Sequence, residues 1–193
     1  MKWSIGALTR PRIGETENGD CPVVRHTDRI TLVGIVDALG HGSAAARVAD
    51  VATRHFEHAP LDGGIESVML DLHQGLVGTR GAAAILCLLK NEDDVLEGCG
   101  VGHVFFRCGP TRVPAVLGEG VLGARLRRVR SFTSKLQRTD RIVLTSDGIA
   151  PHFSLADFEG LSPDRTCSEI MMRHGLGHDD ATVVVVDAEP KSA

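Results

Sequence analysis

The chain has 193 residues, of which 42% are hydrophobic and 24% charged, and its formal net charge is -4. This composition is typical of one globular domain with its own core, and the slightly acidic balance argues against general nucleic-acid binding. The five cysteines never form a Cys-x-x-Cys pair. The first residues lack the apolar core of a signal peptide. No apolar run is long enough to cross a membrane. We therefore expect a cytoplasmic protein with reduced thiols.

Short apolar runs that are rich in β-branched residues and bounded by turn residues predict strands along most of the chain. The clearest strands are predicted at residues 30–36, 82–89, 103–107, 141–145 and 181–186. Weaker strands are predicted at residues 2–8, 21–26, 95–100, 113–117 and 126–133.

Apolar residues at helical spacing predict helices at residues 43–58, 65–76 and 164–174. Ser43 is the expected N-cap of the first helix, and Gly175 is the expected C-cap of the third. Consecutive strands favour antiparallel sheets, and grouped helices favour helix layers on the sheet faces, so the element order predicts an α+β layered domain. That domain is expected to span residues 1–188, followed by a flexible tail at residues 189–193.

Four acidic turns lie at the ends of predicted strands. They are Asn18-Gly19-Asp20, Asp37-Ala38-Leu39-Gly40-His41-Gly42, Ser146-Asp147-Gly148 and Asp179-Asp180-Ala181-Thr182. Any one of them alone is explained as a tight turn, since aspartate and glycine tolerate unusual backbone angles. Together they can converge at one sheet edge, where carboxylate and carbonyl oxygens without cysteine suit Mg²⁺ or Mn²⁺. Clustered carboxylates repel one another, so such a site is expected to need cations.

The order of these motifs resembles the metal-dependent protein phosphatases of the PPM family, and in particular their SpoIIE-like branch. The likeness runs from about Ile5 to Asp187, nearly the whole chain. It implies a layered α-β-β-α sandwich, with two antiparallel sheets flanked by helices, and a binuclear Mn²⁺ or Mg²⁺ centre at one end.

Carried over motif by motif, the resemblance implies that Asp37 bridges both cations. Asp147 and Asp179 would complete the ligands of one cation, while Asp20, with the carbonyl of Ala38, would serve the other directly or through water. The residues expected directly behind these ligands are Gly19, Asp180 and His41, and His41 has two interpretations: it caps the helix start or fills space there, or it orients a ligand or donates a proton to the leaving oxygen. The histidines expected at the surface or behind the ligands are His103, His152 and His178.

Two positions depart from the family pattern. Ala38 occupies the place of a glycine, and its methyl group is tolerable unless the backbone angle φ there is positive. Glu15 occupies the place of an arginine that binds the substrate phosphate in some relatives, with Arg10 and Arg12 as the nearest substitutes. The sequence therefore does not identify the group that would bind the phosphate.

The resemblance implies that phosphoserine or phosphothreonine is hydrolysed by a water that the two cations activate, without a covalent enzyme intermediate. The small size is similar to that of stand-alone phosphatases in the stress-signalling complexes called stressosomes, so the expected partner is a phosphorylated regulatory protein such as a stressosome scaffold protein. The basic stretch Arg125 to Arg130 is either a solvated strand face or a docking surface for that partner. Two alternatives remain: a phosphatase-shaped binding or switch module with weak turnover, and a hydrolase of small phosphoesters.

Overall fold

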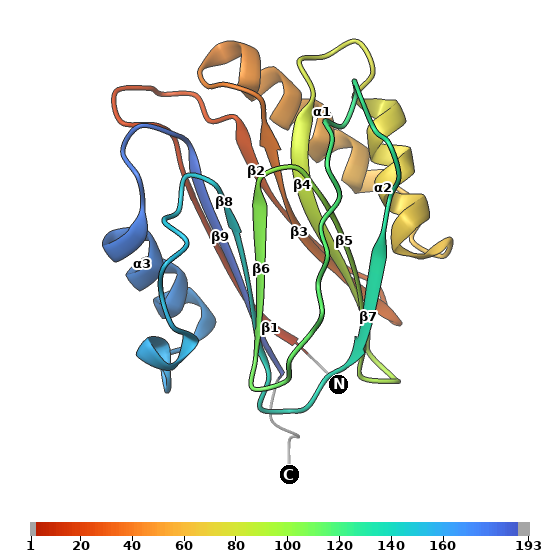
Figure 1. The fold of residues 1–193 in the computed structure, drawn as a ribbon, viewed down its shortest axis with the longest axis vertical. Coiled ribbons are helices and arrows are strands. Elements are labelled where there is room, and N and C mark those ends of the chain that lie inside the picture. Colours follow the sequence, from red (N-terminus) through yellow and green to blue (C-terminus); the bar gives the residue numbers. More distant parts are fainter. Residues whose placement is uncertain (1–2, 189–193) are drawn as a thin grey trace.

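Residues 3–188 of the chain are described by a computed structural model, and they form two antiparallel β-sheets with helices on both outer sides (Figure 1). The four-stranded sheet contains, in order, β1 (Trp3–Arg10), β9 (Ala181–Ala188), β8 (Arg141–Ser146) and β6 (Val104–Gly109). The five-stranded sheet contains, in order, β2 (Asp20–His26), β3 (Ile30–Ala38), β4 (Ala82–Lys90), β5 (Val95–Val101) and β7 (Ser131–Lys135). Helices α1 (Ser43–His58) and α2 (Gly64–Gly75) pack on the five-stranded sheet, and α3 (Pro163–His174) packs on the four-stranded sheet. The predicted α+β sandwich is confirmed.

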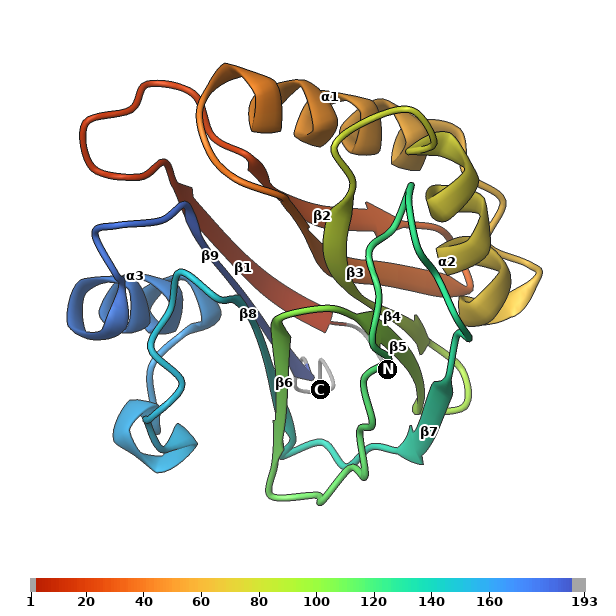
Figure 2. The same cartoon turned by 45° about the horizontal axis from the view of Figure 1, so that its top comes forward.

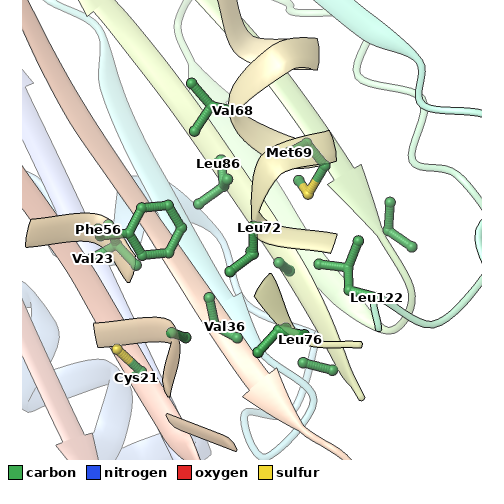
Figure 3. Packing of buried hydrophobic residues seen from close by; sticks show 14 of the residues in the cluster. Cys21, Val23, Val36, Phe56, Val68, Met69, Leu72, Leu76, Leu86 and Leu122 are labelled. Carbon is green, nitrogen blue, oxygen red and sulfur yellow. The ribbon is translucent and has the colours of Figure 1, made fainter. Parts of the chain in front are cut away.

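Three apolar layers hold these elements together, one between the sheets and one beneath the helices on each side. Strands β3 and β4 are buried on both faces, which explains why their sequences are almost continuously apolar. In β3, Val33 and Ile35 face the other sheet, whereas Val36 faces the helices, as the two-residue period of a strand requires. Figure 3 shows the helix-facing layer, to which α1 contributes Phe56 and α2 contributes Leu72.

Helix α1 begins one residue away from its predicted cap. The N-cap is Gly42, with φ of 70°, and Ser43 is the first helical residue and makes no capping bond, so the Ser43 prediction was wrong. Glycine adopts positive φ without steric cost, and this turn from β3 therefore fixes where the helix starts. Helix α3 ends at His174, with Gly175 as its C-cap, as predicted. A side chain there would place its Cβ 2.5 Å from the carbonyl oxygen of Met171.

The connection between β6 and β7 differs most from the sequence-based prediction. No strand forms at residues 113–117, and the strand predicted at residues 126–133 is displaced to β7. This connection crosses from the four-stranded sheet to the five-stranded one. Pro110 and Pro114 lie within it and have no backbone N–H to donate to a sheet.

The basic stretch Arg125–Arg130 is therefore not a strand face. Its arginines are exposed, while Leu126 and Val129 turn inward and pack against the helix-facing layer. The stretch keeps its alternation of polar and apolar residues without sheet hydrogen bonding beyond a single bridge between Gly120 and Leu126.

A short 3-10 helix at Leu155–Phe158 was not predicted. Ser154 and Asp157 form a reciprocal capping box around its first turn, and one turn is too short to show helical periodicity. Residue 2 of the first predicted strand and the predicted tail at residues 189–193 lie outside the described residues. Among the helices of residues 3–188, none has the length and apolar character that a membrane span needs.

Candidate functional site

The topology brings the four predicted aspartates to one end of the sandwich, which is uppermost in Figure 1 and comes forward in Figure 2. Strand β2 begins and β3 ends there, so that Asp20 and Asp37 are direct partners in the β2–β3 register. Strand β8 ends and β9 begins at the same end, with Asp147 directly after β8 and Asp179 shortly before β9. Four turns that are remote in sequence thus meet because neighbouring strands run in opposite directions.

Asp20 is the most deeply buried of these four aspartates, with 5% of its surface exposed. Ser146, at the end of β8, donates a hydrogen bond of 2.7 Å from its Oγ to Oδ2 of Asp20. The Ser146 Oγ in turn accepts a bond of 2.9 Å from the backbone N–H of Thr182. Burial raises the pKa of Asp20 to about 7 despite the hydrogen bonds from Ser146 and Thr182. Asp20 therefore links the two sheets at the centre of the site.

Asp37 is close enough to the other three aspartates of the site to be affected by their charges. Burial raises the pKa of Asp37 to about 9, and repulsion from Asp20, Asp147 and Asp179 adds to the rise. The contact between the Asp37 and Asp147 carboxyls raises the pKa of Asp37 and lowers that of Asp147, the pattern of two acids that share one proton. Burial and the charge of Asp179 raise the pKa of Asp147, while the bond from Asp37 lowers it.

Asp180 holds two loops of the site together. It is 3% exposed, and its carboxylate accepts bonds of 2.8 Å from the backbone N–H groups of both Arg12 and Gly19. Gly148 packs against the same turn so closely that a Cβ there would lie 1.8 Å from the carbonyl oxygen of Asp180. The turns that carry Asp147 and Asp179 are therefore in direct backbone contact, which only glycine at position 148 permits.

Ala38 is compatible with its place in the site. Its backbone N–H donates to the carbonyl of Gly19 at 3.1 Å, and its φ is not positive, so the methyl group causes no backbone strain. Gly19 has no room for a side chain, since a Cβ would lie 2.6 Å from the Cβ of Ala45 and 3.0 Å from Asp180 Oδ2. Gly19 and Asp180, both predicted to lie behind the ligands, are thus in contact with each other.

His41 is held at the rim of the site between two charged side chains. Its Nδ1 lies 3.0 Å from Oε1 of Glu15, and its Nε2 contacts the guanidinium of Arg12. A neutral imidazole with its proton on Nδ1 satisfies both contacts, donating to Glu15 and accepting from Arg12. Glu15, at the position where the PPM resemblance would place an arginine, is therefore the partner of His41.

Two of the three histidines expected at the surface or behind the ligands lie beside Asp147. Electrostatic interaction with His103 and His178 lowers the pKa of Asp147, which places both imidazoles within reach of that carboxylate. His103 lies in the turn between β5 and β6, and the pairing of Val104 with Ser146 sets it opposite Asp147. His152 lies exposed in the loop after β8. The sequence shows only that His103 lies at a predicted strand start. Its position beside Asp147 follows from the β6–β8 register, which the sequence does not give.

Within residues 3–188, no three histidine, cysteine or acidic side chains are already arranged as a complete cage for one metal ion. The Asp20 carboxylate instead accepts a hydrogen bond from the Ser146 hydroxyl, and the Asp37 and Asp147 carboxyls lie next to each other. The raised pKa values show that these carboxyls do not all ionise without added positive charge. An all-oxygen donor set is what Mg²⁺ and Mn²⁺ prefer, so the residues fit such ions once the carboxyl groups rotate toward them.

The comparisons with known proteins agree on the fold. No family model and no curated sequence matches the chain. A structure from work on the bacterial stressosome, described as a modular system adapted to control secondary-messenger signalling, has a TM-score of 0.89 at 26% identity and is matched over 96% of this chain and 100% of its own. RsbX, solved in complex with magnesium, has a TM-score of 0.83 at 18% identity, over 97% of this chain and 96% of its own.

A third similar structure identifies the fold by name. The PP2C phosphatase domain of SpoIIE from Bacillus subtilis, solved with a fragment of its regulatory domain, has a TM-score of 0.74 at 22% identity. The match covers 97% of this chain and 63% of that one. The chain has the PP2C phosphatase fold. In this fold the four aspartates occupy one end of the central sandwich, where the PPM resemblance placed its metal ligands.

Proposed function

We propose that this chain is a metal-dependent phosphatase that removes phosphate from serine or threonine residues of another protein. The observation that carries the proposal is the position of Asp37, which pairs with Asp20 across two strands and lies within electrostatic reach of Asp147 and Asp179. A carboxylate in that position can bridge two cations. Asp147 and Asp179 would complete the ligands of one, and Asp20 with the Ala38 carbonyl would serve the other.

Two Mn²⁺ or Mg²⁺ ions bound there would supply the Lewis acidity that phosphate monoester hydrolysis requires, activating a water and neutralising the phosphoryl oxygens. The chain's own residues set the geometry around them. Asp180 fixes the spacing of two ligand-bearing loops, and Ser146 orients the carboxylate of Asp20. His103 and His178 border Asp147, where an imidazole can donate a proton to the departing serine or threonine oxygen.

The cysteines favour water over a thiol as the nucleophile. Cys21, Cys87, Cys99 and Cys167 are buried, and Cys108 is half-buried. Burial raises the pKa of Cys99, Cys108 and Cys167 to about 12. Because the thiolate is the reactive form of cysteine, these thiols are poorly suited to attack phosphorus.

For the partner, we propose a regulatory phosphoprotein of the stressosome type in the cytoplasm. Support comes from similarity over nearly the full chain to a structure from work on the bacterial stressosome and to RsbX, which was solved with magnesium. The sequence carries no Gly-x-x-x-x-Gly-Lys-Ser phosphate loop, which counts against a nucleotide substrate.

The proposal is tested by phosphate release from phosphothreonine and phosphoserine peptides. We expect turnover with Mn²⁺, none with EDTA, and no loss after iodoacetamide treatment of the folded protein. Loss to iodoacetamide with resistance to EDTA would show a cysteine mechanism. Binding of Mn²⁺ without phosphate release would instead identify a switch module, and faster turnover of nucleotides than of phosphopeptides would identify a small-molecule hydrolase.

A further inference from the structure

A pocket of about 500 Å³ lies beside the aspartate site, between helix α1 and the loop that joins α2 to β4. The helix contributes Arg47, Val48 and Val51 to its wall, and the loop contributes Gly78 and Arg80. A Cβ at Gly78 would meet no atom within 4 Å, so the loop side of the pocket is open.

The loop wall of this pocket is fixed in place by hydrogen bonds. Thr79 donates from Oγ1 to the carbonyl of Leu76 at 2.7 Å, and the same oxygen accepts from the N–H of Gly81 at 3.0 Å. The carbonyl of Gly81 accepts from the N–H of Leu39 at 3.0 Å. The backbone on both sides of Arg80 is therefore fixed by hydrogen bonds, and Gly81 connects it to the loop that follows Asp37.

The side chain of Arg80 extends over that same loop. Both terminal nitrogens and the central carbon of its guanidinium lie 3.3 to 3.4 Å from where a Cβ of Gly40 would be. Gly40 has φ of 83°, and its lack of a side chain leaves the space that the guanidinium occupies. One wall of the pocket thus reaches the segment that carries Asp37.

The charges around this pocket are unbalanced. Arg47 and Arg80 are exposed, and within residues 3–188 neither forms a hydrogen bond or an ion pair. No carboxylate lines the pocket, although the chain as a whole has a net charge of -4. Two large apolar side chains in the adjoining loops are also exposed, Leu39 at 44% and Val77 at 59%. Unpaired arginines next to exposed apolar residues are typical of a surface that binds another protein.

We propose that this pocket binds acidic residues that flank the phosphorylated serine or threonine of the substrate protein, with Arg47 and Arg80 as the specificity-determining residues. The inference rests on the proposed phosphatase function and adds the class of sequence that the site selects. A guanidinium binds a carboxylate through paired N–H donors, and two unpaired arginines favour an acidic segment over a neutral or basic one. Because the guanidinium of Arg80 lies over Gly40, in the loop after Asp37, the acidic residues of the substrate would bind next to the aspartates.

The test uses three phosphothreonine peptides that differ only in their flanks, which are acidic, amide or lysine residues. Nonhydrolysable phosphonate versions report affinity in Mn²⁺, and the phosphorylated versions report kcat/KM. The variant combines Arg47→Glu with Arg80→Glu, and Arg47→Glu alone serves as a second variant away from the Asp37 loop. The matched control combines Arg29→Glu with Arg138→Glu, two exposed arginines in turns at the opposite end of the sandwich.

We expect the unmodified protein to bind the acidic peptide about tenfold more tightly than the amide peptide, from complementary charge. The double variant should prefer the lysine peptide, Arg47→Glu should lose most of the acidic preference, and the control should keep it. Equal affinity of the unmodified protein for all three peptides would overturn the proposal, as would an acidic preference that survives in the double variant. Failure of the phosphatase function is distinguishable, because it would remove phosphate release and leave the order of phosphonate affinities to be measured.

Discussion

Asp20 and Asp37 are direct cross-strand partners in adjacent antiparallel strands, so that two acidic side chains lie on the same face at the same end of one sheet. Like charges in that relation destabilise a strand pair, and here burial adds to the cost. Burial is the main cause that raises the pKa of both carboxyls, to about 7 for Asp20 and about 9 for Asp37, and the charge of Asp20 adds to the rise at Asp37. This pair therefore makes the metal-free fold less stable, and a bound cation can restore that stability.

Asp37→Asn should abolish metal-dependent turnover and leave the fold intact. The amide keeps the shape of the carboxyl but cannot serve as a charged bridge, and we expect kcat to fall at least about a hundredfold, as when a group that stabilises transition-state charge is removed. Phosphate release from a phosphothreonine peptide in Mn²⁺ measures the effect. The control is Asp28→Asn, an exposed aspartate in the turn before β3, which should retain full activity. Substantial Mn²⁺-dependent turnover in Asp37→Asn would remove Asp37 from the metal centre.

Without metal, the free energy of unfolding should fall as pH rises from about 4 toward 9. A carboxyl whose pKa is raised in the folded state binds a proton that the unfolded chain has already lost, so the folded state loses relative stability through this window. Asp20 contributes from the ordinary aspartate range up to about pH 7, and Asp37 up to about pH 9. Urea unfolding in EDTA at pH 5, 7 and 9 measures the slope. It should be shallower in Asp37→Asn, and an equal slope in both proteins would show that Asp37 ionises freely.

Mn²⁺ should stabilise the folded protein. A ligand that binds only the folded state raises stability by about 2.7 kcal/mol at a hundredfold excess over its dissociation constant, which for a domain of this size is a rise in Tm of roughly 5–10 °C. Thermal unfolding in EDTA and in Mn²⁺ measures the shift, and Asp37→Asn should lose most of it. A melting curve that saturating Mn²⁺ does not move would show that the aspartates do not form a metal site.

Gly148→Ala should reduce both stability and activity. A Cβ at this position would lie 1.8 Å from the carbonyl oxygen of Asp180, so the turns carrying Asp147 and Asp179 would have to separate. We expect a loss of at least about 2 kcal/mol in the free energy of unfolding, within the range for overpacked sites. Gly160→Ala is the control: φ there is 75° and no atom lies near the new methyl group, so it should cost about 1 kcal/mol from backbone strain and spare activity. Equal activity in both variants would show that the spacing of the turns is not critical.

The sequence was sufficient for the elements whose signals are local. Residues 30–36 and 82–89 are apolar on both faces and became the central strands β3 and β4. The acidic turns were identified because each adjoins a strand end, and antiparallel topology then brought them together. Their roles as metal ligands stay predictions.

The parts that the sequence did not reveal depend on contacts between remote segments. Nothing local indicates that Glu15 and Arg12 would hold His41, since those contacts join the β1–β2 loop to the turn before α1. The place of Arg80 above Gly40 likewise follows from the pairing of β3 with β4. The strand predicted at residues 113–117 failed because apolar alternation there serves a connection that crosses between sheets.

The basic stretch Arg125–Arg130 should assist the encounter with an acidic partner protein without affecting chemistry. It is connected to the site end through Val121, whose N–H donates to the carbonyl of Arg125 at 2.8 Å and whose side chain packs against Gly81. Arg127 and Arg128 are exposed, so charge there acts mainly on the rate of association and is screened by salt. Combining Arg127→Glu with Arg128→Glu should therefore lower kcat/KM for a phosphoprotein substrate several-fold at low salt, and less at high salt.

A small aryl phosphate separates this effect from damage to the site. The aryl phosphate carries no protein surface for the stretch to attract, so its turnover by the Arg127→Glu, Arg128→Glu variant should be unchanged. Arg29→Glu with Arg138→Glu supplies the same change of charge at the far end of the sandwich. Equal loss on both substrates would mean that the stretch supports the fold or the aspartates. Equal retention on both, at every salt concentration, would mean that the partner approaches over another surface. A loss confined to the protein substrate and reduced by salt is the result that long-range attraction requires, because screening weakens exposed charges separated by more than about 10 Å at 0.1 M salt and leaves the buried aspartates largely unaffected.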